Sequence, residues 1–160
     1  MASWLDIEQR APHIARAGRA RLDQARVALL GTLRPDGSPR ISPVEPYFTR
    51  GQLVFGAMAW SGKAQDLRRD PRCVLHSTIS EPDAGKPELK LYGLTATAGD
   101  FLRNACRQAW WIGQPHAAAD VVLLDVTQAV LIEWDLEDGQ MTTTHWSPGP
   151  GLWQRARSYP

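Results

Sequence analysis

Short β-rich runs separated by turn-forming residues dominate the sequence after its first 26 residues and limit the folds open to it. The runs VALLGTLR, PRISPVEPYF and QLVFGAM follow one another closely, with the turn-forming tripeptides PDG and TRG between them. Similar runs cover residues 72–80, 89–98, 120–126, 128–136 and 140–146. Most connections are too short for a helical crossover, which a parallel pair of strands needs. The pattern therefore predicts an antiparallel meander.

Helical signals flank these runs and complete the predicted fold class. Ser3 fits a capping pattern, and Pro12 starts a second helix. Further short helices are predicted over residues 62–70 and 101–112, the second capped by Asp100. Six or seven antiparallel strands with a few helices predict a mainly β (α+β) domain, a small antiparallel barrel with capping helices.

The composition is that of one globular domain. The chain has 160 residues, of which 43% are hydrophobic and 22% are charged. Its 18 basic and 17 acidic side chains leave a net charge of +1, so no overall field attracts nucleic acid or anionic lipid. No apolar run approaches the roughly 18 residues of a membrane span, and the first residues lack the pattern of a secretory signal. We expect a cytoplasmic protein that binds neither nucleic acid nor membranes.

The cysteines and histidines predict no metal site. Cys73 and Cys106 stand far apart, without the CxxC spacing of cysteine zinc sites or a disulfide framework. His76 has no His, Cys or acidic neighbour at metal-ligand spacing.

Three prolines, Pro39, Pro43 and Pro46, interrupt the second β-rich run. Proline has no N–H group to donate to a sheet ladder, so it is confined to edge strands, strand starts and bulges. The run is therefore predicted as an edge strand, or as a bulged strand whose backbone groups are free for other partners.

The segment FGAMAWSGK, residues 55–63, leads from a strand into a helix. Ser61 is placed to cap this helix, and Lys63 adds a positive charge in its first turn. Amide groups at a helix start carry partial positive charge and bind phosphate. A Walker loop does not fit, because Ala57 occupies its first glycine position and Ala64 replaces its magnesium-binding hydroxyl. The segment predicts a phosphate site; the alternative is an ordinary capped helix with a solvated lysine.

Residues 26–76 resemble the pyridoxamine 5′-phosphate oxidase-like family, the FMN-binding split barrels. The matching features occur in order: a first strand, the PDG turn, an RxSPV strand, a second glycine turn, the SxK helix start and the LRRDPR ending. The later YGLTATA strand extends the resemblance more weakly. The resemblance implies a split β-barrel, and we place this FMN-binding domain, with its N-terminal helices, at residues 1–145.

The resemblance also implies a homodimer with FMN in a cleft between the subunits. The FMN phosphate would be held by Arg40, Ser61 and Lys63. Two strand segments would line the rest of the cofactor: Ile41, Ser42, Pro43 and Val44 beside the ring, and Gly56 and Ala57 beside the ribityl chain. Trp60, which adjoins Ser61, is a further candidate because an indole ring can cover a planar cofactor.

The chain departs from family members that oxidise pyridoxamine phosphate. Glu45 stands where those members carry a lysine, Gly56 and Ala57 stand where they carry hydroxyl residues, and an RxHDR-like motif near the C-terminus is absent. The resemblance therefore does not extend to the vitamin substrate. A deazaflavin, which a related branch holds, is the alternative cofactor.

The end of the chain, residues 146–160, is rich in turn-forming residues and is predicted as a tail. It either folds over the partner's cofactor as a lid or forms a loosely ordered terminus. His145, Trp146 and Arg155 are the candidate substrate contacts. Arg155 is included because a guanidinium group pairs well with an anionic substrate or a phosphate.

We predict an FMN-dependent oxidoreductase that acts on a small-molecule substrate. A non-enzymatic flavin or deazaflavin binding, carrier or redox-sensing protein is the alternative. The residues present no nucleophile triad and no glycosidase-like carboxylate pair, as expected where the flavin itself carries the electrons. The sequence identifies neither the catalytic residues nor the substrate and electron donor.

Overall fold

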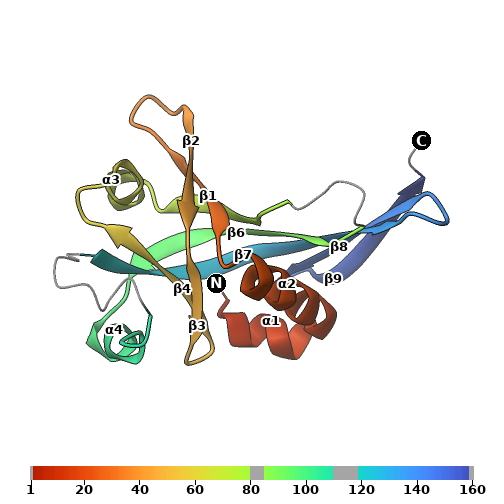
Figure 1. Ribbon diagram of the computed structural model, residues 1–160, viewed down its shortest axis with the longest axis horizontal. Helices are drawn as coiled ribbons and strands as arrows, with labels where there is room; N and C mark the ends of the chain where they lie inside the picture. The colour runs from red at the N-terminus through yellow and green to blue at the C-terminus, as the bar shows by residue number, and fades with distance from the viewer. Residues whose placement is uncertain (1, 80–84, 110–118, 159–160) are drawn as a thin grey trace.

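The computed structural model describes residues 2–79, 85–109 and 119–158, and Figure 1 shows their strands as one twisted sheet. The helices in these ranges are α1 (Trp4–Arg10), α2 (Pro12–Ala25), α3 (Gly62–Arg69) and α4 (Asp100–Ala105). The strands are β1 (Ala28–Leu33), β2 (Pro39–Val44), β3 (Pro46–Thr49), β4 (Gln52–Met58), β5 (Arg72–Ser77), β6 (Glu88–Thr97), β7 (Ala119–Asp135), β8 (Gln140–Ser147) and β9 (Gly151–Ser158).

The strands pair antiparallel throughout, which confirms the predicted mainly β fold class. The predicted number of strands is too low for the described residues, which form nine. The proline-rich run breaks at Glu45 into β2 and β3. In contrast, two predicted strands join into β7, because Thr127 is accommodated as a bulge opposite Tyr92 and Gly93.

The order β2-β1-β5-β6-β7-β4-β3 places β2 and β3 at the two ends of the main sheet. The proline-rich strand is therefore an edge strand, the first of its two predicted forms. Pro43 pairs with Leu29 of β1, and among the described strands none pairs with the opposite edge of β2. This edge lies close to β4, near the other end of the main sheet, so the sheet curls into a barrel that is split between β2 and β4.

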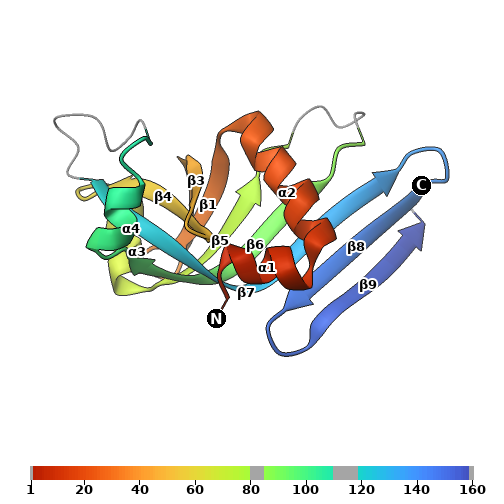
Figure 2. The same cartoon turned by 90° about the horizontal axis from the view of Figure 1, so that it is seen from below.

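Helices α1 and α2 cover one face of the sheet, over β5, β6 and β7 (Figure 2). The predicted cap of α1 is confirmed: the Ser3 and Asp6 side chains each accept a hydrogen bond from the other's backbone amide. Side chains on this face, such as Leu89 and Leu131, form the core with Ile14 of α2. Alternate strand positions point to the opposite side of the sheet, which we call the outer face.

Strand β7 extends the sheet beyond the barrel. Its 17 residues span about 55 Å at ~3.3 Å per residue. The second half of β7, with β8 and β9, forms an arm at the opposite end of the molecule from α3 (Figures 1 and 2).

The C-terminal segment differs from the predicted tail. Residues 151–158 form β9 and pair with β8, and the predicted boundary at residue 146 falls inside β8. The turn-forming residues are concentrated at 148–150, where they make the β8–β9 turn.

The cap predicted for α4 is also corrected. Gly99 is the N-cap of α4 and Asp100 is its first helical residue. The last part of the helix predicted over residues 101–112 lies outside the described residues. Among the described helices, none combines the length and the apolar character required to cross a membrane.

Candidate functional site

Helix α3 begins beside the edge strand β2 and starts with the predicted serine cap. Ser61 has extended backbone angles (φ −70°, ψ 150°), and its Oγ accepts a hydrogen bond from the Ala64 amide at 3.3 Å. The Ser61 hydroxyl proton remains able to donate. The first turn of α3 therefore offers a hydroxyl donor and helix amides to an anion.

Arg40 of β2 is held beside this helix start by a buried carboxylate. Its Nε donates to Asp66 Oδ2 at 2.6 Å, and the Thr32 hydroxyl donates to the same oxygen at 2.9 Å. Arg69 approaches Asp66 Oδ1 at 3.4 Å. Asp66 is only 2% exposed, so this carboxylate joins β1, β2 and α3 in the interior.

Burial alone raises the pKa of Asp66, but hydrogen bonds from Arg40 and Thr32 outweigh it and hold the pKa below the ordinary value of 3.8. Asp66 is therefore an anion at neutral pH, paired with the arginine that faces the start of α3.

Gly62, the first residue of α3, lies against the Arg40 guanidinium. A β-carbon at this position would come within 2.9 Å of Arg40 Cζ and within 3.0 and 3.2 Å of the two terminal nitrogens. The absence of a side chain thus allows the guanidinium to pack directly on the helix start. The sequence places Arg40 22 residues before Gly62, and the fold brings them into contact.

Lys63 turns toward β2. Its Nζ donates to the carbonyl oxygen of Pro43 at 2.7 Å, so it uses a backbone group on the proline-interrupted strand. Burial lowers the pKa of Lys63 below its ordinary 10.5, and the nearby negative charge of Glu45 raises it in part. The ammonium group is therefore partly desolvated in the free protein.

A pocket of about 200 Å³ opens beside Lys63. It is lined by Pro43 of β2, by Glu45 at the break between β2 and β3, and by Gly56 of β4. The structure therefore brings together three predicted groups: Arg40, the Ser61–Lys63 helix start and the backbone at Pro43.

The other predicted cofactor residues divide between surface and core. Ile41 is 72% exposed on β2, and Ser42 is half-buried on the same strand. The side chains of Val44 and Ala57 are buried in the core, so these residues present mainly backbone groups. Trp60, directly before the cap, is 77% exposed.

The predicted substrate residues lie on the arm and are not brought to the start of α3 within one chain (Figure 1). His145 of β8 stacks on Trp153 of β9, with ring centroids 3.7 Å apart and planes 5° apart. Burial lowers the pKa of His145. Arg155 is exposed on β9. Trp146 is 2% exposed in the core beneath the helices, which leaves its indole no surface for a substrate.

Asp66 and Thr32 are functional candidates that sequence reasoning missed. One signal was available: Asp66 is an acidic residue on an otherwise basic helix, one turn after its start. Its role depends on contact with Arg40, 26 residues earlier.

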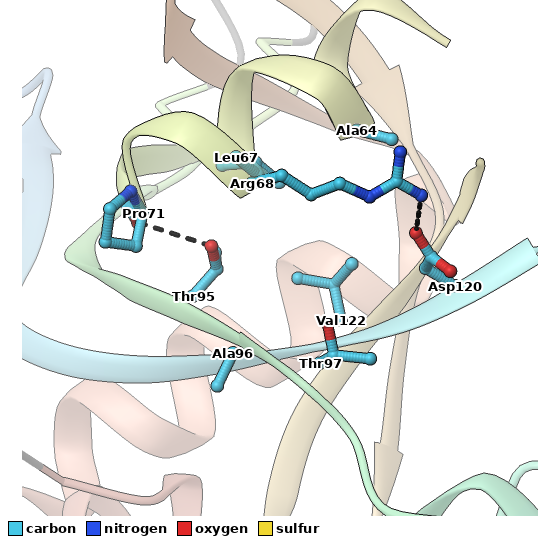
Figure 3. A pocket seen from close by; sticks show the side chains of 9 residues that line it. All are labelled: Ala64, Leu67, Arg68, Pro71, Thr95, Ala96, Thr97, Asp120 and Val122. Carbon is cyan, nitrogen blue, oxygen red and sulfur yellow. Dashed lines mark hydrogen bonds and ion pairs between the residues drawn. The ribbon is translucent and has the colours of Figure 1, made fainter. Parts of the chain in front are cut away.

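A second pocket, of about 330 Å³, lies between α3 and strands β6 and β7 (Figure 3). Arg68 lines it and pairs with Asp120 at 2.5 Å, while the Thr95 hydroxyl donates to the Pro71 carbonyl at 3.3 Å. The charges at this pocket are thus already paired with each other. Among the described residues, no cluster of His, Cys, Asp and Glu is suited to a metal ion.

Comparisons with known proteins identify the fold. No family model matches the chain, and no curated protein matches its sequence. Among solved structures, a pyridoxamine 5′-phosphate oxidase-related, FMN-binding protein from Nostoc punctiforme is similar with a TM-score of 0.63 and 17% identity, over 96% of this chain and 97% of that chain.

Two further solved structures are similar to this chain over most of its length. PhzG from Burkholderia lata, solved with tetrahydrophenazine-1-carboxylic acid, has a TM-score of 0.68 and 10% identity, over 96% of this chain and 92% of that chain. A heme-binding protein from Mycobacterium smegmatis has a TM-score of 0.58 and 15% identity, over 89% of this chain and 88% of that chain. The chain therefore has the split-barrel fold of the pyridoxamine 5′-phosphate oxidase-like proteins.

Proposed function

We propose that this protein is a homodimeric, FMN-dependent oxidoreductase that binds the FMN phosphate at the start of α3. The observation behind this proposal is the convergence of Arg40, Ser61 and Lys63 on one helix end, where Lys63 also lines a pocket. Two cations, a hydroxyl and helix amides suit a phosphate monoester. The similarity to a protein described as FMN binding supports the same cofactor.

The pocket residues also suit a flat, polar-edged ring. Gly56 contributes no side chain, and β2 is an edge strand whose outer backbone groups have no further strand to pair with in the described sheet. Backbone groups in this position satisfy the donors and acceptors of a heteroaromatic ring. Lys63 is already at the carbonyl of Pro43, so one side chain can link the strand with the phosphate region.

FMN, when bound, supplies the electron-transfer chemistry, and the chain supplies binding and orientation. Arg40 and Lys63 offset the phosphate charge. Glu45 places a negative charge at the pocket, where vitamin-oxidising relatives carry a lysine. This charge favours a substrate with cationic or hydrogen-bond-donating groups and disfavours an anionic one.

A second copy of the chain is proposed to cover the outer face around β2. Ile41, Leu29 and Tyr92 are exposed on this face, and Val74 packs over Gly31 between them. Exposed contiguous apolar surface marks protein interaction sites.

The same second copy would complete the cofactor pocket. Pro43 pairs with Leu29 at the outer face and also lines the pocket beside Lys63. The pocket of one chain, about 200 Å³, is smaller than the ~300–1,000 Å³ usual for ligand sites. His145 and Arg155, which lie on the arm, would then reach the cofactor only from the partner subunit.

The proposal is tested by denaturing the purified protein and recording the absorption spectrum and mass of the small molecule released. We expect FMN. A deazaflavin or heme would identify a different cofactor, and a protein that releases no flavin and takes up no added FMN would contradict the proposal. Steady oxidation of NAD(P)H by the FMN-loaded protein separates an oxidoreductase from a flavin-binding, carrier or sensing protein.

A further inference from the structure

We propose that Asp66 is a positioning residue for the phosphate site: it fixes the Arg40 guanidinium on Gly62, with the terminal nitrogens beside the start of α3. This inference rests on the proposed function, because it assigns a role within the same site. Asp66 itself is buried behind Arg40 and is not a ligand of the phosphate.

The contact with Asp66 leaves the two terminal nitrogens of Arg40 available to a ligand. A guanidinium has five N–H donors, and Asp66 takes the one on Nε at 2.6 Å. Across residues 2–79, 85–109 and 119–158, the terminal nitrogens of Arg40 have no hydrogen-bond partner, and the side chain is 30% exposed. These nitrogens form the edge of the guanidinium that pairs bidentately with a phosphate.

Two constraints fix the position of this guanidinium. Asp66 holds it from the α3 side, and Asp66 is itself held by the Thr32 hydroxyl at 2.9 Å. Gly62 supports its face, because a β-carbon there would lie 2.9 Å from Arg40 Cζ. A long side chain fixed before the ligand arrives loses less conformational freedom on binding.

The charge of Asp66 distinguishes positioning from a direct electrostatic effect. A carboxylate near the site repels a phosphate, so neutralising it would strengthen FMN binding if charge alone mattered. If Asp66 acts by positioning Arg40, the same change weakens FMN binding. The two explanations therefore predict opposite signs for Asp66→Asn.

The experiment measures the Kd values of FMN and riboflavin, which differ only in the phosphate, for the unaltered protein and for four variants: Asp66→Asn, Gly62→Ala, Arg40→Ala and the double variant Arg40→Ala/Gly62→Ala. We expect Asp66→Asn and Gly62→Ala each to weaken FMN binding about tenfold and to leave riboflavin binding within twofold. In an Arg40→Ala background, Gly62→Ala should have no further effect on FMN. Gly62→Ala provides the test independently if Asp66→Asn fails to fold.

Several results would overturn the assignment. One is unchanged or tighter FMN binding in folded Asp66→Asn. Another is a loss of riboflavin affinity equal to the loss for FMN, which indicates a general structural role. A Gly62→Ala effect that persists without Arg40 is a third. If the unaltered protein binds FMN no more tightly than riboflavin, the phosphate site itself is absent and the proposed function fails with it.

Discussion

The start of α3 and the β8–β9 arm both carry arginines and tryptophans, but they hold them differently. At α3, Arg40 is tied to a buried carboxylate and packs on a glycine, and Lys63 is half-buried at a pocket. On the arm, Arg155 is exposed on a strand that has solvent on both faces. A basic side chain makes a pre-formed binding group only where the fold fixes it, and of these two regions only α3 meets that condition.

The largest expected effect is the difference in stability between tryptophan substitutions on the two faces of the arm. Trp146 is buried in the core and Trp153 is 45% exposed on the outer face, although the two belong to neighbouring paired strands. We expect Trp146→Ala to lower the free energy of unfolding by about 3–5 kcal/mol. Trp153→Ala should cost only its stacking on His145, about 0.5–1.5 kcal/mol. Denaturant titration of both variants measures the difference. Equal losses would mean that the outer face of the arm is also buried in solution.

The next largest effect is on FMN affinity, when one basic residue in each region is replaced. Lys63→Ala should weaken FMN binding by about 1.5–3 kcal/mol, the usual contribution of a hydrogen bond to a charged group. Arg155→Ala, on the exposed strand, should change it by at most about 1 kcal/mol. Fluorescence titration with FMN measures both. A larger loss for Arg155→Ala than for Lys63→Ala would reverse the assignment of the two regions.

The cap of α3 has a smaller effect. Ser61→Ala removes the acceptor for the Ala64 amide and the hydroxyl offered to phosphate. We expect a loss of about 1 kcal/mol in both stability and FMN affinity. Ser147→Ala, at the end of the arm strand β8, is the matched control and should leave FMN affinity unchanged. A Ser61→Ala protein with wild-type FMN affinity would show that the Ser61 hydroxyl does not contribute to phosphate binding.

The smallest effect concerns pH. The ammonium form of Lys63 binds phosphate, so affinity falls as the pH rises through its pKa, which burial holds below 10.5 in the free protein. We therefore expect the preference for FMN over riboflavin to decline at alkaline pH, and to do so less in Lys63→Gln. Both ligands carry the same ring, so the ratio of their Kd values isolates the phosphate. An equal alkaline decline in Lys63→Gln would assign the titration to another group.

Local signals predicted the helix start well. The serine cap, the short helix after it and the edge position of β2 each depend on neighbouring residues, and the structure confirms all three. The contact of Asp66 with Arg40 was not predicted, because it depends on how α3 packs against β2 and not on spacing in the chain.

The arm was poorly predicted for a different reason. Seven of the eight residues of β9 are exposed, so the strand shows no alternation of buried and exposed positions from which to recognise it. For the same reason the sequence could not separate Trp146 from Trp153. Their faces are set by the register of β7, β8 and β9, in which Trp146 joins Ala129 on the core side.

The central claim is that a phosphate group binds at the start of α3. Comparing the Kd values of FMN and riboflavin for the unaltered protein under identical conditions tests it most directly. We predict that FMN binds at least tenfold more tightly, a difference of about 1.4 kcal/mol or more. Equal affinities for the two flavins would contradict the claim.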